Sequence, residues 1–167
     1  MAMTVKHFFD ASTSTLSYVV SDDETARCAI IDPVLDLDYA SGTLSTDSAD
    51  TLIAYAQDSG LAVDCILETH IHADHITGMS ELKKQTDCET VMGEKTPADV
   101  VTIKLKDQEN ISIDNIKIKA VYTPGHTYES FSFIMDDRVF TGDTLLINGT
   151  GRTDFQNGNP YDSYNSI

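Results

Sequence analysis

Apolar residues alternate with polar ones, or run together, in two groups of short segments, as is typical of β-strands. The first group of predicted strands covers residues 5–9, 16–21, 27–31, 62–68 and 89–92. The second group covers residues 111–113, 116–122, 130–135 and 138–141. The last two segments are separated only by Asp136 and Asp137, so they predict a hairpin.

Two stretches between these strands carry apolar residues at helical spacing. Within residues 45–59, Leu52, Ile53 and Ala56 recur on one face, and Gly60 stands where a C-terminal cap belongs. Residues 77–86 predict a second helix. Helices that interrupt two groups of strands indicate stacked sheets with helices outside, an α+β fold. A length of 167 residues predicts a single domain over residues 1–167.

The charge balance narrows the class of partner. Eleven basic residues against 27 acidic ones give a net charge of −16, which argues against nucleic-acid binding and against an anionic membrane surface. No basic and apolar leader opens the chain, and no apolar run is long enough to span a membrane, so we expect a cytoplasmic protein. Cys28, Cys65 and Cys88 are widely spaced, which predicts buried reduced thiols rather than disulfides or ligands.

Candidate chemistry is concentrated directly after the predicted strand 62–68. Three of the five histidines, His70, His72 and His75, lie here together with Asp74. Histidine and aspartate are ordinary ligands of first-row metals, and the end of a strand can present them rigidly. A lone histidine is more often a surface or core residue, but three histidines and an aspartate in this pattern indicate a metal site.

Two further strand ends carry residues of the same kind. The T-P-G-H-T loop presents His126, and the F-T-G-D-T turn presents Asp143. Each alone would be an ordinary turn residue, whereas three strand ends that each offer a ligand reinforce one another. His7 lies outside this scheme and is expected to be a plain strand residue.

These motifs carry a resemblance to a known family. The H-x-H-x-D-H run, the T-P-G-H-T loop and the F-T-G-D turn, in this order, resemble the metallo-β-lactamase superfamily, whose fold is an αββα sandwich. Within it, residues 69–78, 139–147 and the G-T-G-R-T-D-F-Q segment 149–156 are similar to the persulfide dioxygenases, also called sulfur dioxygenases. The stretch 127–130 is closer to the bacterial branch called beta-lactamase hydrolase-like.

The resemblance implies a centre with one Fe(II) per chain, held by His70, His126 and Asp143. Two histidines and one carboxylate leave open positions on iron for substrate and oxygen. The implied substrates are glutathione persulfide and O2, and the implied products are sulfite and glutathione.

Other residues of the motifs receive supporting roles from the same resemblance. His72, Asp74 and His75 would orient the ligands and shape the pocket. Arg152 and Asp154 are expected to form a charged pair that braces the loop after the metal aspartate, with solvated turn charges as the alternative.

Two alternatives stay open. The first is a thioester hydrolase similar to glyoxalase II, with two metals such as zinc and a bridging hydroxide that attacks a carbonyl. Its ligands would be His70, His72, Asp74, His75, His126 and Asp143. The second is a metal-binding or sulfur-sensing module without catalysis.

The end of the chain departs from the family pattern. The segment 161–167 begins what the resemblance implies to be a helix. Family members continue from there through a further strand, a further helix and another histidine in a Y-P-x-H-type motif. The sandwich is therefore expected to lack its C-terminal part, and the oligomeric state, a homo-oligomer included, stays open.

Overall fold

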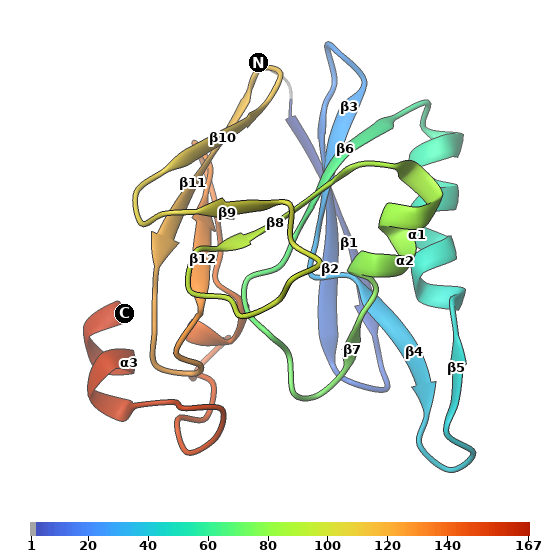
Figure 1. Cartoon of the computed structure of the whole chain (residues 1–167). Helices are drawn as coiled ribbons and strands as arrows, with labels where there is room; N and C mark the ends of the chain where they lie inside the picture. The colour runs from blue at the N-terminus through green and yellow to red at the C-terminus, as the bar shows by residue number, and fades with distance from the viewer. Residues whose placement is uncertain (1–2) are drawn as a thin grey trace. The chain divides into compact units, whose positions relative to one another are not determined.

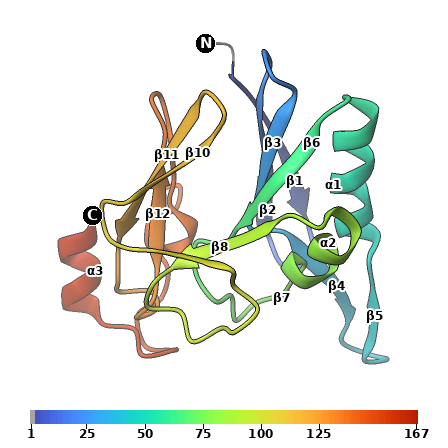
Figure 2. The same cartoon turned by 45° about the horizontal axis from the view of Figure 1, so that its top comes forward.

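The computed structural model describes residues 3–167 (Figures 1 and 2). The strands are β1 (Met3–Asp10), β2 (Thr15–Asp22), β3 (Arg27–Ile31), β4 (Val34–Asp38), β5 (Thr43–Ser45), β6 (Ala62–Leu67), β7 (Ile76–Thr77), β8 (Glu89–Gly93), β9 (Ile103–Leu105), β10 (Asn110–Ile113), β11 (Ile116–Tyr122), β12 (Phe131–Ile134) and β13 (Val139–Phe140). The helices are α1 (Asp47–Asp58), α2 (Met79–Thr86), the 3-10 helix η1 (Gly142–Thr144) and α3 (Pro160–Ser166). The mixture of strands and helices confirms the predicted α+β class.

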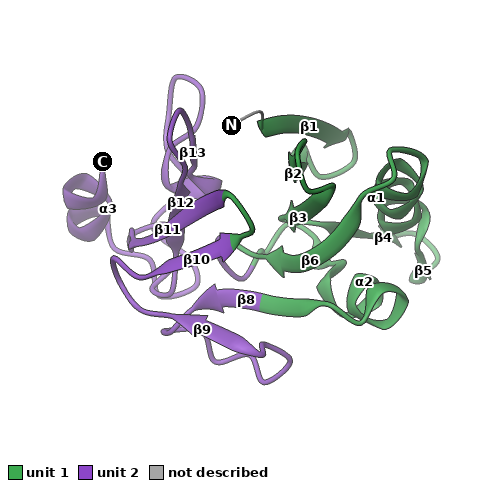
Figure 3. Ribbon diagram, turned by 90° about the horizontal axis from the view of Figure 1, so that it is seen from above, with its two compact units in different colours: residues 1–68, 72–90, 113–115 green, residues 69–71, 91–112, 116–167 purple. Residues whose placement is uncertain are grey.

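The chain divides into two compact units, coloured separately in Figure 3. Unit 1 consists of residues 1–68, 72–90 and 113–115. Unit 2 consists of residues 69–71, 91–112 and 116–167. The boundaries pass on either side of residues 69–71, so the histidine-rich segment contributes to both units. The single domain expected over residues 1–167 stays a prediction.

The main sheet of unit 1 has the order β1-β2-β3-β6, followed by the start of β8. β1 pairs antiparallel with β2 and β2 antiparallel with β3, whereas β3 and β6 run parallel with an irregularity between Cys28 and Ala29. The adjacent ends of β3 and β6 are fully buried, and their apolar residues are Ile30, Ile31, Ile66 and Leu67. Because β3 and β6 are parallel, the residues that follow them emerge at the same edge of the sheet.

Two helices pack against this sheet at β6, and they lie on the same side of it (Figures 1 and 2). The buried face of α1 is formed by Ala49, Leu52, Ile53 and Ala56, which confirms the predicted helical spacing. The helix ends as predicted, since Gly60 adopts a φ of 68° beyond the Ser59 cap. α2 ends at Asp87, which is also left-handed, with a φ of 54°.

Unit 2 contains a second sheet with the order β10-β11-β12-β13. β11 and β12 pair antiparallel, with Tyr122 opposite Phe131, and β12 pairs antiparallel with β13. Phe131 and Phe133 are almost completely buried. The ring of Phe131 occupies the place where a Cβ at Gly93 would stand, so only glycine fits at the end of β8. Beyond Thr90, β8 pairs parallel with β9.

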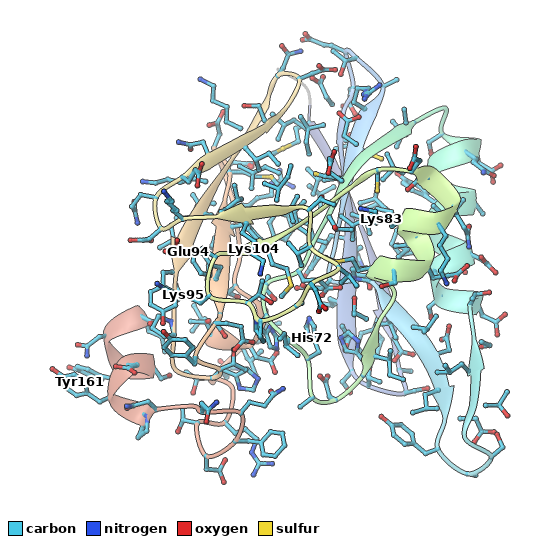
Figure 4. The ribbon with its side chains drawn as sticks, viewed as in Figure 1. His72, Lys83, Glu94, Lys95, Lys104 and Tyr161 are labelled. Carbon is cyan, nitrogen blue, oxygen red and sulfur yellow. The ribbon has the colours of Figure 1, made fainter. Side chains whose placement is uncertain are left out.

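The last helix of unit 2 begins at a well-formed cap. The side chain of Asn159 accepts hydrogen bonds from the N–H groups of Tyr161 and Asp162, and Pro160 occupies the first helical turn. Tyr161 is 73% exposed and lies on the outer side of α3 (Figure 4). The helical segment implied for residues 161–167 is therefore present in α3.

Several short elements were not predicted from the sequence. β4, β5 and β7 form a three-stranded sheet, and β9 and η1 are also additions. Asp32 and Pro33 do end β3, but the chain enters β4 immediately afterwards. β5, β7 and β9 have only two or three residues each, too few for a periodic pattern to be visible.

The expectations for His7 and for the three cysteines are confirmed. His7 lies in β1. Cys28, Cys65 and Cys88 are buried free thiols. Within residues 3–167, no helix combines the length and the hydropathy that a membrane crossing would need.

Candidate metal centre

His70 follows β6 in the short segment that belongs to unit 2. The carbonyl of Thr69 accepts a hydrogen bond of 2.8 Å from the N–H of Phe131, which ties this segment to the start of β12. The imidazole of His70 is almost completely buried, and its Nδ1 lies 3.0 Å from Oγ1 of Thr69. Since Nδ1 bonds to the threonine, Nε2 is the candidate ligand atom.

His126 is held in the loop between β11 and β12. Its Nδ1 donates to the carbonyl oxygen of Arg152 at 2.8 Å. A carbonyl oxygen only accepts, so Nδ1 carries the proton and Nε2 carries the lone pair that a metal needs. Nε2 lies 3.5 Å from Oδ2 of Asp143. The histidine therefore presents its basic nitrogen toward the carboxylate that is its expected co-ligand.

Asp143 lies in η1, and two glycines let this turn approach the histidines. Gly142 has a φ of 48°, and a Cβ there would collide with the side chain of Thr69. A Cβ at Gly151 would collide with the carbonyl of Asp143 and the ring of His126. The G-D and G-T-G-R spacing in the sequence is thus explained by close contact between loops.

The structure brings together the three residues that the resemblance implied as ligands. One ligand atom from each of His70, His126 and Asp143 lies within 4.8 Å of the others. The two imidazole rings stand 5.0 Å apart between centroids, at an interplanar angle of 88°. Two imidazoles and one carboxylate form a donor set that suits Fe(II) with open coordination positions, and it also suits zinc. The residues therefore fit the implied metal, and all three belong to unit 2.

His72 belongs to unit 1 and faces two carboxylates; it is labelled in Figure 4. Its Nε2 lies 3.4 Å from Oδ1 of Asp32 and 3.3 Å from Oε2 of Glu68, and all three side chains are more than nine-tenths buried. Burial alone would lower the pKa of His72, but hydrogen bonds to Asp32 and Glu68 raise this pKa well above its ordinary value. Burial raises the pKa of Glu68 to about 7.

A further group in unit 1 surrounds His75. Its Nδ1 donates to the carbonyl of Ile76 at 3.0 Å, and its buried Nε2 has no hydrogen-bond partner among the described residues. Burial, followed by the charge on His72, lowers the pKa of His75. Ligand atoms of His72, Asp74 and His75 lie within 4.8 Å of one another. This trio has the donors that a second metal would require.

Arg152 and Asp154 do form the expected charged pair. The guanidinium donates to both carboxylate oxygens of Asp154, at 2.8 and 3.0 Å. Both side chains are more than three-fifths exposed, so the pair itself is screened by water and salt. The contact with the metal centre is made by the main chain of Arg152, whose carbonyl holds His126. A bracing role for the side-chain pair stays a prediction.

Four polar residues near these groups were not singled out from the sequence. Asp32 follows β3 and Glu68 follows β6, so the parallel pairing of the two strands is what places their carboxylates together. Glu129 and Gln156 both bond to the main chain of Ile71. Their positions inside the T-Y-E-S and R-T-D-F-Q stretches were visible, but nothing in one sequence shows that they reach Ile71.

The comparison with known families agrees with this geometry. The profile described as "Metallo-beta-lactamase superfamily" matches residues 12–98 and 92–167. The chain belongs to the metallo-beta-lactamase superfamily. The predicted metallo-β-lactamase fold is thereby confirmed, and the chain carries the metal-binding site of that fold.

Individual relatives in this superfamily differ in their names. The chain is 35% identical to a beta-lactamase hydrolase-like protein of Xylella fastidiosa, over 98% of this chain and 42% of the relative. It is 34% identical to Glyoxylase B2 of Dictyostelium discoideum, over 92% of this chain and 61% of the relative. It is 31% identical to the human mitochondrial persulfide dioxygenase ETHE1, over 98% of this chain and 61% of the relative.

A solved structure supports the same family. The crystal structure of ETHE1 from Myxococcus xanthus superposes with a TM-score of 0.89 at 33% identity. The match covers 98% of this chain and 67% of the crystallised one. The chain thus spans between two fifths and two thirds of the length of these four relatives.

Proposed function

We propose that this chain forms the iron centre of a persulfide dioxygenase that oxidises glutathione persulfide. The observation that carries the proposal is the complete set of two histidines and one carboxylate, His70, His126 and Asp143, gathered inside unit 2. Similarity to two proteins named ETHE1 supports the same branch.

Each residue of the trio would supply one ligand atom to such a centre. His70 and His126 would offer Nε2, because Thr69 and the Arg152 carbonyl engage their Nδ1 atoms. Asp143 would supply the one anionic ligand. When bound, iron supplies the open positions at which a persulfide and dioxygen react. Overall, one persulfide, one O2 and one water give one thiol, one sulfite and two protons, so the outer sulfur is oxidised and the S–S bond breaks.

A thioester hydrolase is the second candidate function. It is favoured by one observation, the trio of His72, Asp74 and His75, which could hold a second metal. His72 in particular donates Nε2–H toward carboxylates, an arrangement common among histidines that bind a metal through the other nitrogen. Because Asp32 and Glu68 raise the pKa of His72, a second metal would have to displace a proton from its Nδ1.

Substrate turnover separates the two functions. Protein reconstituted with Fe(II) under anaerobic conditions should consume oxygen with glutathione persulfide and release an equal amount of sulfite, while it hydrolyses S-lactoylglutathione poorly. The Asp143→Asn variant should lose this activity, whereas the exposed Asp137→Asn variant should keep it. Fast thioester hydrolysis without oxygen uptake would assign the hydrolase, and turnover of neither substrate would assign a metal-binding module without catalysis.

A further inference from the structure

The peptide groups of Ile71, the residue after His70, are bound by side chains on both sides. The N–H of Ile71 donates to Oε1 of Glu129 at 2.9 Å. The carbonyl of Ile71 accepts from Nε2 of Gln156 at 3.1 Å. Both hydrogen bonds lie within unit 2 and connect residues that are 58 and 85 positions apart in the chain. The main chain next to the candidate ligand His70 is therefore held by hydrogen bonds from two loops that are distant in sequence.

Each of these loops also carries one of the other ligands. Glu129 lies three residues after His126, in the connection from β11 to β12, and its side chain is buried. Gln156 lies in the loop after Asp143, the same loop whose Arg152 carbonyl holds His126. The two hydrogen bonds thus tie together the three segments that supply the three candidate ligands.

The amide of Gln156 has only one orientation that suits this contact. Because the Ile71 carbonyl can only accept, the amide nitrogen must face it and Oε1 must point away. That Oε1 is buried and has no hydrogen-bond partner among residues 3–167. The backbone of Gln156 is left-handed, with a φ of 46°, a conformation that non-glycine residues rarely adopt. A buried unpaired acceptor and a strained backbone both cost stability, so stability alone does not account for this glutamine.

We propose that Glu129 and Gln156 are positioning residues for the metal ligand His70. Their grip on the two sides of Ile71 fixes the direction in which the His70 side chain leaves the main chain, and thereby the place of its Nε2 relative to His126 and Asp143. Neither side chain needs to touch the metal or the substrate. This inference rests on the proposed ligand set of the iron centre.

Four substitutions separate the hydrogen bonds from the bulk of the side chains. Glu129→Gln keeps an oxygen that accepts from the Ile71 N–H, whereas Glu129→Ala removes it. Gln156→Glu places a second acceptor against the Ile71 carbonyl, whereas Gln156→Ala only removes the donor.

The segment between β9 and β10 offers matched controls. Glu109 is exposed and accepts from the N–H of Lys106 at 2.8 Å, so Glu109→Ala removes a comparable bond at a distance from the ligands in sequence. Gln108 has a φ of 65° and bonds to Asp107, so Gln108→Ala matches Gln156→Ala in its backbone conformation.

Cobalt(II) is the probe, because its visible absorption bands report the geometry of its ligands. It is titrated anaerobically into each apo protein in competition with a chelator, and the thermal melt of each apo protein is recorded. Loss of a group that orients a ligand lowers metal affinity by about 10- to 100-fold. We expect that loss, with shifted absorption bands, for Glu129→Ala, Gln156→Ala and Gln156→Glu. Glu129→Gln and both controls should stay close to the wild type.

The outcomes distinguish this inference from the proposal beneath it. His126→Ala is titrated alongside, and wild-type cobalt binding by that variant would mean that the proposed ligand set is wrong. If His126→Ala loses cobalt while Glu129→Ala and Gln156→Glu bind it with unchanged affinity and spectrum, the positioning role is overturned and the ligand set stands. If Glu129→Gln binds cobalt as weakly as Glu129→Ala does, the positioning role is also overturned. Should Glu129→Ala not fold, Gln156→Glu decides the question.

Discussion

The hydrogen bonds of the two buried imidazoles decide which of their atoms can hold a metal. The Arg152 carbonyl accepts a hydrogen bond from Nδ1 of His126, and Oγ1 of Thr69 forms a hydrogen bond with Nδ1 of His70. At the scale of residues, the strand ends with histidine and aspartate indicated a metal site, and the resemblance singled out the trio that the structure brings together, while its role as the ligand set stays a prediction. The roles of Asp32, Glu68, Glu129 and Gln156 were not predictable, since their partners are distant in the chain or follow from the pairing of β3 with β6.

Removal of any single ligand should remove the metal. His70→Ala, His126→Ala and Asp143→Ala should each abolish stoichiometric iron binding, because three protein ligands leave none to spare. His72→Ala should reduce activity more than iron content, since His72 contacts carboxylates in unit 1 rather than the trio. Iron content by elemental analysis and oxygen uptake give the two readouts. If His72→Ala loses iron as completely as His70→Ala, His72 is a direct ligand.

Substitution of Gly151, in the loop after Asp143, should destabilise the protein for a steric reason. Gly151→Ala places a methyl group against the ring of His126, and overpacking of this kind costs about 1–3 kcal/mol. We expect a lower melting temperature and weaker iron binding. Gly149→Ala is the matched control, because its Cβ would meet no described atom within 4 Å. Equal melting temperatures for the two variants would contradict the close approach of these loops.

At the scale of elements, long patterned segments were predictable and short ones were not. The strands from β1 to β3, helices α1 and α2, and the pair β11 and β12 follow clear apolar patterns. β5, β7 and β9 have only two or three residues each, too few to carry a pattern of their own. α3 was expected only through the resemblance, although Asn159 followed by Pro160 is a helix-start signal that can be seen in the sequence.

α3 braces the loop that carries His126. Ser166 Oγ donates to the carbonyl of Pro124 at 2.7 Å, and the N–H of Asn159 donates to the carbonyl of Gly125 at 2.8 Å. A Cβ at Gly125, where φ is 141°, would collide with the backbone of Ser163. The position of α3 and the conformation of the His126 loop therefore depend on each other.

Loss of the α3 cap should weaken this bracing. Asn159→Ala removes the acceptor for two N–H groups and should lower the free energy of unfolding by about 1 kcal/mol, as measured by urea denaturation. Asn165→Ala, whose side chain bonds only to the exposed carbonyl of Tyr161, should change it by less than about 0.5 kcal/mol. If Asn159→Ala lowers the free energy of unfolding by as little as Asn165→Ala does, the cap contributes nothing measurable.

At the scale of the whole molecule, the buried reduced thiols were correctly expected from the wide spacing of the three cysteines. Burial raises the pKa of Cys28 to about 12, and burial also raises the pKa values of Cys65 and Cys88. A thiol with that pKa carries on the order of one thiolate in ten thousand at about pH 8. The single domain stays a prediction, and no pattern in the sequence indicates where the boundaries of the two compact units lie.

The thiols should consequently be inert while the protein is folded. An aromatic disulfide reagent should titrate no cysteine in the native protein and all three in denaturant, because the reagent requires both access and thiolate. Rapid reaction of one cysteine in the native protein would mean that unit 1 opens locally around it.

The metal content of the protein tests the central claim most directly. After anaerobic reconstitution with excess Fe(II) and removal of unbound metal, elemental analysis should give one iron per chain for the wild type. It should give one for His75→Ala and none for His126→Ala. Two metals per chain in the wild type, falling to one in His75→Ala, would contradict the single iron centre and would assign the two-metal centre of a hydrolase.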